Sequence, residues 1–206
     1  AVNTFCRSVF FVASEEAFFC CGCSLAAVAV DCIGTHCVPF SGGVAKGSST
    51  QEEETYRRTN IGAILNQGAT RLNETQYALT TQVEIIRAGQ ELGYAFMVAE
   101  DRQVIDVMSM PAVNLEKGPG AFDATPEQRI LMYQKIVQFV IEARRYQAVV
   151  VTPIGCGAFG WKAREVAHMM ITAWRFFKPR TRLVLAVRLT DYDMYVSRTS
   201  GDNLAV

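Results

Sequence analysis

Three successive glutamates at 52–54 follow a glycine-rich stretch and open a segment with the composition of a helix. The preceding stretch, SGGVAKGSST at 41–50, contains the pair Gly42 and Gly43. Glycines allow the backbone to lie against a ligand, and carboxylates carry out general acid and base catalysis. The glycine-rich stretch could therefore hold a sugar substrate beside one of the glutamate carboxylates. Acids in a first helical turn are also stabilised by the helix dipole, so a purely structural role is the alternative.

The geometry of a helix limits what these acids can do. Neighbouring helical side chains point about 100° apart, so Glu52 and Glu53 cannot bracket one glycosidic bond from opposite faces. One acid must act on the bond while the other positions the sugar. An acid that donates a proton at neutral pH needs a raised pKa, which a nearby negative charge or an apolar wall would provide.

A second glycine-rich stretch, GCGAFG at 155–160, lies between a predicted strand and a predicted helix. This context suits a phosphate-binding loop, because backbone N–H groups can approach phosphate oxygens and the helix contributes its positive end. A tight turn that binds nothing is the structural alternative. We expect a phosphate site instead, because three glycines at this spacing cost folding entropy without an evident packing need.

The same spacing matches the G-x-G-x-x-G fingerprint of dinucleotide-binding proteins, so an NAD(P)-dependent oxidoreductase is a rival interpretation. That fingerprint usually lies at the first βα turn, whereas this loop comes late in the chain. The nearest candidate for a ribose-binding acid is Asp191, while Arg188 would suit a 2′-phosphate. The rival also leaves the acidic block unexplained.

Both glycine-rich loops must be held by secondary structure, and the sequence predicts strands and helices that alternate along the chain. Six apolar runs have strand length and a β-branched or aromatic content without strict alternation, which is typical of a sheet covered on both faces. Strands that alternate with helices predict an α/β three-layer sandwich. The predicted strands are 8–13, 25–31, 94–99, 104–110, 148–154 and 183–189.

Two segments, 126–147 and 163–177, have the apolar spacing of helices, and 41–60 is predicted to form a loop and then a helix. Pro126 suits the first turn of the first helix. The apolar face of that helix is predicted to contain Ile130, Tyr133, Val137, Val140 and Ile141. The corresponding face of the second helix is predicted to contain Val166, Met169, Met170 and Trp174.

Composition excludes several classes of protein. Half of the 206 residues are hydrophobic, which predicts a folded globular chain of one domain. The 20 basic and 20 acidic residues cancel, whereas a protein that grips a nucleic acid by its backbone would carry a basic excess. We therefore expect no direct DNA binding. No stretch is long and apolar enough to span a membrane, so we expect no membrane association.

The seven cysteines do not follow the pattern of a small disulfide-bonded secreted protein. Most lie in apolar surroundings, where a free cysteine behaves as a small hydrophobic residue. A zinc site made of Cys20, Cys23, His36 and Cys37 is an alternative. It lacks the second well-spaced pair that such sites normally have, so we do not favour it.

Taken together, these motifs resemble the microbial-type poly(ADP-ribose) glycohydrolases, a family of macrodomain-like fold. Ser41-Gly42-Gly43 followed by Gln51-Glu52-Glu53 is similar to the family's glycine run and Gln-Glu-Glu. The loop at 155–160 is similar to its Gly-Cys-Gly-Val/Ala-Phe-Gly loop. The stretch VIDVMSMPAVN at 104–114 is similar to its strand and Pro-Ala-x-Asn turn. The order of these motifs extends the resemblance from about residue 8 to about residue 190.

The resemblance implies a single macrodomain-like domain over 1–206, a three-layer α/β/α sandwich around a mixed sheet, with a short loose tail after about residue 198. It also implies a hydrolase that cleaves ribose–ribose O-glycosidic bonds of poly(ADP-ribose) and releases ADP-ribose. The substrate would be poly(ADP-ribose) or ADP-ribosylated protein. The sequence does not reveal the compartment, and an intracellular one, cytoplasmic or nuclear, is the expectation. No metal or organic cofactor is implied.

The resemblance gives Glu53 the catalytic role of protonating the departing ribose oxygen and then helping to activate water. Glu52 would bind ribose hydroxyls. Phe159 would pack on the terminal ribose, with core packing as the alternative. Asp31 is the candidate for a family asparagine, and Glu15 or Glu16 would recognise adenine. The substrate-binding residues implied are Gly42, Gly43, Val44, Gln51, Gly155, Cys156, Gly157, Ala158, Phe159, Gly160, Asp31 and Glu15.

The chain also departs from the family pattern. Ser41 replaces the first glycine of the run, and Thr152-Pro153 stands where the family has a small pair. A non-catalytic reader of ADP-ribose with the same fold is the main alternative. Both glutamates are present, and a reader has no need of them, so we expect an enzyme.

Overall fold

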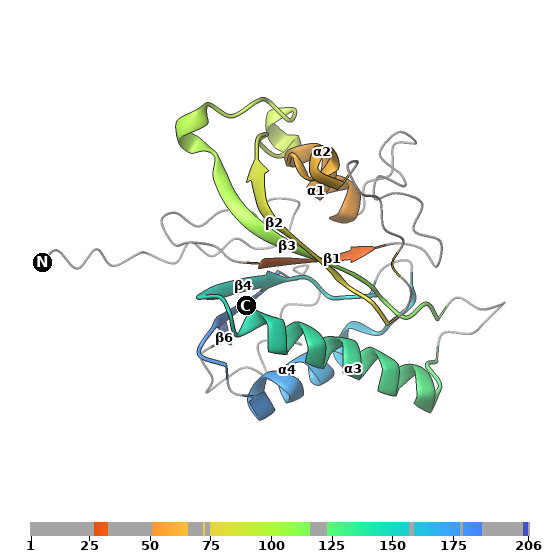
Figure 1. The fold of residues 1–206 in the computed structure, drawn as a ribbon. Helices are drawn as coiled ribbons and strands as arrows, with labels where there is room; N and C mark the ends of the chain where they lie inside the picture. The colour runs from red at the N-terminus through yellow and green to blue at the C-terminus, as the bar shows by residue number, and fades with distance from the viewer. Residues whose placement is uncertain are drawn as a thin grey trace, which may run out of the picture.

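The computed structural model of the protein describes eight stretches of the chain. A six-stranded sheet with the order β2-β3-β1-β4-β5-β6 forms its middle layer. Helices α1 and α2 lie on one side of this sheet, and α3 and α4 lie on the other (Figure 1). The predicted three-layer α/β/α sandwich is therefore confirmed. The described stretches are 27–32, 51–65, 72, 75–115, 123–156, 159–177, 179–186 and 204–205.

Three parallel strands occupy the centre of the sheet. β1 (Ala27–Cys32) is parallel to β3 (Gln103–Pro111) on one side and to β4 (Ala148–Val151) on the other. The last residue of β1, Cys32, lies opposite the last residue of β3, Pro111. The carboxyl ends of these parallel strands therefore lie together along one border of the sheet, where the connecting loops leave it. This border is called the carboxyl edge below.

The outer strands make the sheet mixed. β5 (Arg182–Leu185) pairs in parallel with β4, and β6 (Leu204–Ala205) pairs in parallel with β5. β6 lies within the stretch after residue 198. On the opposite side, β2 (Ala78–Ile85) pairs with β3 in the antiparallel sense, which confirms the predicted mixed sheet.

The helices predicted at 126–147 and 163–177 begin where they were predicted, although the first ends at Ala143, and α2 was not predicted. α1 (Gln51–Arg58) and α2 (Ile61–Leu65) precede β2, and α4 (Ala163–Phe177) follows β4. α3 (Pro126–Ala143) begins with a capping box, in which Thr125 Oγ1 accepts from the Gln128 backbone N–H at 3.2 Å. The Gln128 side chain in return accepts from the backbone N–H of Thr125 at 2.8 Å, so two N–H groups at the helix start are satisfied.

The main core lies between the sheet and the pair α3 and α4. The predicted face of α4 is confirmed, because Val166, Met170 and Trp174 are buried and Met169 is half-buried. The predicted face of α3 is wrong at both of its ends: Ile130 is 60% exposed and Ile141 is 44% exposed. α3 has apolar residues around most of its circumference, so periodicity alone did not choose the face. The side chains that α3 buries are Met132, Lys135, Ile136, Phe139, Val140 and Ala143.

The predicted strand at 94–99 is also wrong. This segment belongs to the tip of the β2–β3 hairpin, which contains the 3-10 turns Gln90–Leu92 and Ala99–Asp101. Gly93 (φ 62°) and Tyr94 (φ 57°) have left-handed backbone, which ends the extended conformation. Phe96 makes only an isolated bridge, to Arg87. Two of its apolar side chains, Phe96 and Val98, are 67% and 61% exposed, so apolar composition alone did not produce a buried strand.

The sequence analysis did not predict β2. Its middle is polar, and a β-bulge shifts its register between Thr80 and Val83, with Gln82 at a φ of 58°. The bulge interrupts the alternation by which a strand is recognised in a sequence. The predicted strand at 8–13 lies outside the described residues. Within the described part of the chain, no helix is long and apolar enough to cross a membrane.

Candidate active site

The described part of the predicted site includes the end of β1, the residues after β4 and the first turn of α1. The chain leaves β1 toward the layer of α1 and α2, and it leaves β3 toward the layer of α3 and α4 (Figure 1). In open α/β sheets, the place where successive connections diverge to opposite faces is where ligands bind. Topology alone therefore directs attention to the ends of β1, β3 and β4.

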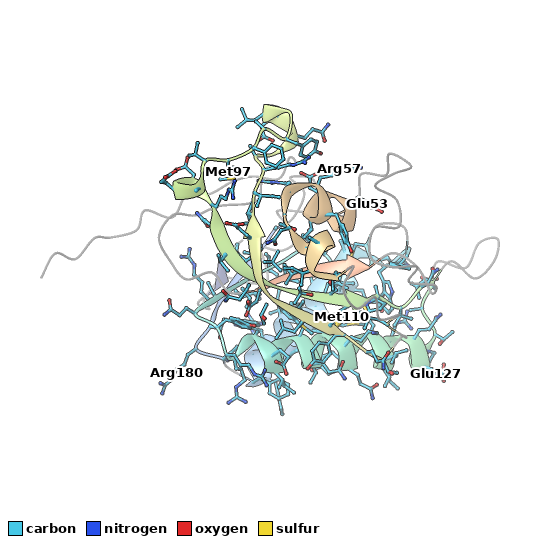
Figure 2. All side chains as sticks on the ribbon, turned by 45° about the horizontal axis from the view of Figure 1, so that its top comes forward. Glu53, Arg57, Met97, Met110, Glu127 and Arg180 are labelled. Carbon is cyan, nitrogen blue, oxygen red and sulfur yellow. The ribbon has the colours of Figure 1, made fainter. Side chains whose placement is uncertain are left out.

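α1 places Glu53 near this edge. The helix contacts β1, and Thr59, directly after it, bridges to Ile85, whose partner in β3 is the first residue, Gln103. α1 therefore runs away from the carboxyl edge toward the opposite edge. Its first turn, which contains Glu53, is the end nearer the carboxyl ends of the strands (Figure 2).

Glu53 is buried, with 4% of its surface exposed. Glutamate is rarely this buried unless it has partners or a function. Gln51, Glu52 and Glu53 are consecutive in α1, and the expectation that one acid acts on the bond while the other positions the sugar stays a prediction. The side chains of Gln51 and Glu52 lie outside the described part.

Two further charged residues of α1, Glu54 and Arg58, interact with the hairpin tip. Glu54 Oε2 accepts a hydrogen bond of 2.7 Å from the hydroxyl of Tyr94, at the hairpin tip. Arg58, one turn further along, is 5% exposed. Burial lowers the pKa of the Arg58 guanidinium, while the negative charges of Glu54 and Glu91 oppose that shift. Sequence reasoning missed Tyr94, which lies 40 residues from Glu54 and carries no motif.

The glycine loop after β4 is a closed turn. Gly155 (φ 73°) and Gly160 (φ 77°) both have left-handed backbone, which favours glycine. The Trp161 backbone N–H donates to the Gly155 carbonyl at 3.0 Å, and that of Cys156 donates to Pro153 at 3.2 Å. The described ends of the loop therefore form a tight turn, the conformation named by the structural alternative, and the binding of phosphate by this loop stays a prediction. Gly157 and Ala158 lie outside the described residues.

Gly155 also has a packing reason to be glycine. A Cβ at this position would lie 2.8 Å from Cδ1 of Trp161 and 3.2 Å from Cβ of Ala112. No packing need for these glycines is evident in the sequence, and the structure supplies one at Gly155. Close packing of the loop is compatible with a phosphate site, because it fixes the backbone N–H groups in place.

The glycine loop is fixed to the turn that follows β3. The indole N–H of Trp161 donates to the Val113 carbonyl at 2.6 Å, and the backbone N–H of Leu115 donates to the Phe159 carbonyl at 3.0 Å. The motif at 104–114 and the loop at 155–160 are therefore in direct contact. Phe159 is 4% exposed and packs in the main core, as the core-packing alternative expects. Its contact with a ribose stays a prediction.

Other predicted site residues are placed only in part. The backbone of Asp31 pairs with Met110 one residue before the end of β1, but its side chain is not described. Cys156 is half-buried, and its thiol lies 3.6 Å from the Ile154 carbonyl, to which it donates. The residues Gly42, Gly43, Val44, Glu15 and Glu16 lie outside the described part.

No group of three or more His, Cys, Asp or Glu in the described stretches is arranged to hold a metal ion. The alternative zinc ligands Cys20, Cys23, His36 and Cys37 lie outside those stretches, as do Arg188 and Asp191 of the dinucleotide interpretation. The glycine loop follows β4 in the observed order of elements, which is not the first βα turn of the dinucleotide-binding fold.

Comparison with known proteins identifies the fold. No protein-family model matches the sequence, and no curated protein matches it. A solved structure of poly(ADP-ribose) glycohydrolase from Deinococcus radiodurans in complex with ADP-ribose is 17% identical with a TM-score of 0.64, covering 87% of this chain and 77% of that one. Another crystal form of that complex is 15% identical with a TM-score of 0.62, covering 85% and 75%. The chain therefore has a macrodomain-like fold of the poly(ADP-ribose) glycohydrolase type, as its motifs predicted.

Proposed function

We propose that this protein is a hydrolase that cleaves the ribose–ribose O-glycosidic bonds of poly(ADP-ribose) and releases ADP-ribose. The observation that carries the proposal is Glu53, a buried acid in the first turn of α1 at the end nearer the carboxyl edge of the sheet. The glycine loop fixed by Trp161 lies at the same edge. A neighbour of the same fold was solved with ADP-ribose, which supports the class of ligand.

In this proposal Glu53 acts first as a general acid. Its carboxyl proton passes to the departing ribose oxygen while the bond from that oxygen to the anomeric carbon breaks, and the carbon gains oxocarbenium character. The resulting carboxylate then accepts a proton from water as the water oxygen bonds to the anomeric carbon. The products are ADP-ribose and a chain that is one unit shorter, and the acid has regained its proton.

The loops supply the binding in this scheme. Backbone N–H groups of 155–160 bind the diphosphate, because two of the glycines have the left-handed conformation that turns the backbone sharply there. Gly42, Gly43 and Val44 approach the distal ribose, and Glu52 binds ribose hydroxyls. An anionic substrate held by backbone amides needs no broad basic surface, which is consistent with a formal net charge of zero.

The test is incubation of the protein with labelled poly(ADP-ribose). We expect the native protein to release ADP-ribose and Glu53→Gln to lose at least about a hundredfold in rate, since general acid–base catalysis typically contributes 10²–10⁴-fold. Calorimetry should show that the variant still binds ADP-ribose. Glu84→Gln is the matched control, because Glu84 lies on β2 in a partly exposed ion pair with Arg102 at 3.8 Å.

The outcomes separate the alternatives. Equal release by the native protein and Glu53→Gln would remove Glu53 from its role. ADP-ribose binding without any release would identify a reader instead of an enzyme. Tighter binding of NADH or NADPH than of ADP-ribose would favour the oxidoreductase.

A further inference from the structure

Tyr94 connects the tip of the β2–β3 hairpin to the helix that carries Glu53. Its hydroxyl donates to Glu54 Oε2 at 2.7 Å, and Glu54 directly follows Glu53 in α1. The hairpin tip, marked by Met97, and α1, marked by Arg57, lie on the same side of the sheet (Figure 2). A hydrogen bond between segments 40 residues apart in sequence thus acts on the first turn of α1.

The backbone at Tyr94 is unusual. Its φ of 57° is left-handed, a conformation that only one other non-glycine residue, Gln82, adopts within the described residues. Left-handed backbone is disfavoured for a residue with a Cβ. Such a conformation persists where the surrounding structure requires it. Here it follows Gly93, also left-handed at φ 62°, and the Tyr94 hydroxyl reaches back to α1.

The base of the hairpin tip is attached to the other end of α1. The Arg58 carbonyl accepts from the backbone N–H groups of Ile86 at 2.8 Å and Arg87 at 3.0 Å. Within the tip, the Ala88 N–H donates to Ala95 at 2.9 Å, and the Arg87 guanidinium lies 4.4 Å from the centre of the Phe96 ring. The tip is therefore an ordered support that holds α1 at its last residue by backbone bonds and at its first turn by Tyr94.

A helix as short as α1 depends on such support. It has 8 residues, and isolated helices of this length are not stable in water, so tertiary contacts must fix its first turn. Glu54 has few alternatives to Tyr94, because its other oxygen, Oε1, is buried and makes no hydrogen bond with the described residues. Loss of the Tyr94 hydroxyl would leave both carboxylate oxygens without a donor from that part of the chain.

We propose that Tyr94 is a positioning residue, whose hydroxyl fixes the first turn of α1 through Glu54 and thereby fixes the Glu53 carboxyl against its substrate. The inference rests on the proposed function, and Tyr94 itself touches no reacting atom in it. Burial raises the pKa of the Tyr94 hydroxyl, the bond to Glu54 raises it further, and Arg57 opposes the shift. The hydroxyl therefore keeps its proton at neutral pH and remains a donor.

The first test compares Tyr94→Phe with Tyr146→Phe. Both variants remove a hydroxyl that donates to a carboxylate, but the Tyr146 bond of 2.9 Å goes to Asp106 on β3. We expect Tyr94→Phe to lower kcat on poly(ADP-ribose) by about tenfold, the typical effect of losing one hydrogen bond to a charged group. The Kd for ADP-ribose should change by less than about twofold, because the diphosphate loop is untouched. Tyr146→Phe should keep native kcat and Kd.

A second test uses the acceptor. Glu54→Gln keeps an oxygen that can accept from Tyr94, so its kcat should stay well above that of Glu54→Ala. If the two side chains act only through their shared bond, the kcat of the double variant Tyr94→Phe with Glu54→Ala should be no lower than that of the slower single variant. Native kcat in Tyr94→Phe, or losses that multiply in the double variant, would overturn the inference.

Amide hydrogen exchange separates this inference from the proposed function. We expect the amides of the first turn of α1 to exchange faster in Tyr94→Phe than in the native protein or in Tyr146→Phe. If the native protein releases no ADP-ribose, the proposed function fails, and exchange alone decides whether Tyr94 fixes the helix. Equal exchange in the two variants would overturn that claim whatever the activity.

Discussion

Replacing Gly155 by alanine tests the packing of the glycine loop. The backbone there has a φ of 73°, and a left-handed residue with a Cβ costs about 1–2 kcal/mol. The new Cβ would also lie 2.8 Å from Cδ1 of Trp161, well inside the ordinary contact distance of about 3.5–4.0 Å. Forcing an extra methyl group into a packed site costs a further 1–3 kcal/mol, roughly.

Trp161 cannot move away without loss. Its side chain is buried, at 3% exposure, and its indole N–H donates to the Val113 carbonyl at 2.6 Å. Displacement of the ring would leave that buried carbonyl without its partner. We therefore expect Gly155→Ala to lower the free energy of unfolding by about 2–5 kcal/mol, the sum of the backbone and packing contributions.

Gly93→Ala is a matched control for the backbone contribution alone. Gly93 has a similar φ of 62°, but a Cβ added there would meet nothing within 4 Å. Its alanine variant should therefore lose only about 1–2 kcal/mol. Urea unfolding of both variants at constant m-value measures the two free energies. The difference between them is the contribution of the contact with Trp161.

The result that would refute this reasoning is a Gly155→Ala variant no less stable than Gly93→Ala. It would show that Trp161 and Ala112 yield without penalty, and that the close approach in the structure does not constrain the loop. If the reasoning holds, Gly155→Ala should also weaken ADP-ribose binding in calorimetry, because the displaced backbone is the proposed diphosphate site.

Two further predictions concern single hydrogen bonds. Trp161→Phe keeps a ring but removes the donor to the Val113 carbonyl, and should lower the free energy of unfolding by about 1–3 kcal/mol in urea titration; a native value would show that the bond contributes nothing. Burial, followed by the bond to Asp106, raises the pKa of Tyr146 from 10.0 to about 12, so the folded state favours the neutral hydroxyl. Its contribution to stability is complete below about pH 10 and is lost as the pH rises toward 12, so Tyr146→Phe should show a shallower alkaline loss of stability. An unchanged alkaline slope would contradict that assignment.

Local patterns in the sequence determined much of the scaffold. The limits and the buried face of α4 follow from its helical spacing, and β1, β3, β4 and β5 lie within or overlap the apolar runs that were predicted to be strands. The glycine loop lay where it was predicted, between β4 and α4. These features depend on interactions between near neighbours, which a sequence displays directly.

Tertiary contacts decided the remainder. The face of α3 was set by the sheet and α4, because the helix is apolar around most of its circumference. The segment 94–99 has strand-like composition, but it makes only the isolated bridge from Phe96 to Arg87 and belongs to the hairpin tip with its 3-10 turns. The packing role of Gly155 also could not be seen in the sequence, since Trp161 contacts it only when the turn closes.

For the candidate site, the sequence by itself determined the chemical groups: a block of acids, two glycine-rich loops and a strand-and-turn motif, in a fixed order. Only the tertiary structure decided that Glu53 is buried, that the residues flanking the glycine loop bond to the turn after β3, and that Tyr94 bonds to α1 from a distant hairpin. The physical reason is that burial and long-range hydrogen bonds depend on distances between segments far apart in the chain. A sequence records the order of residues along that chain and not those distances.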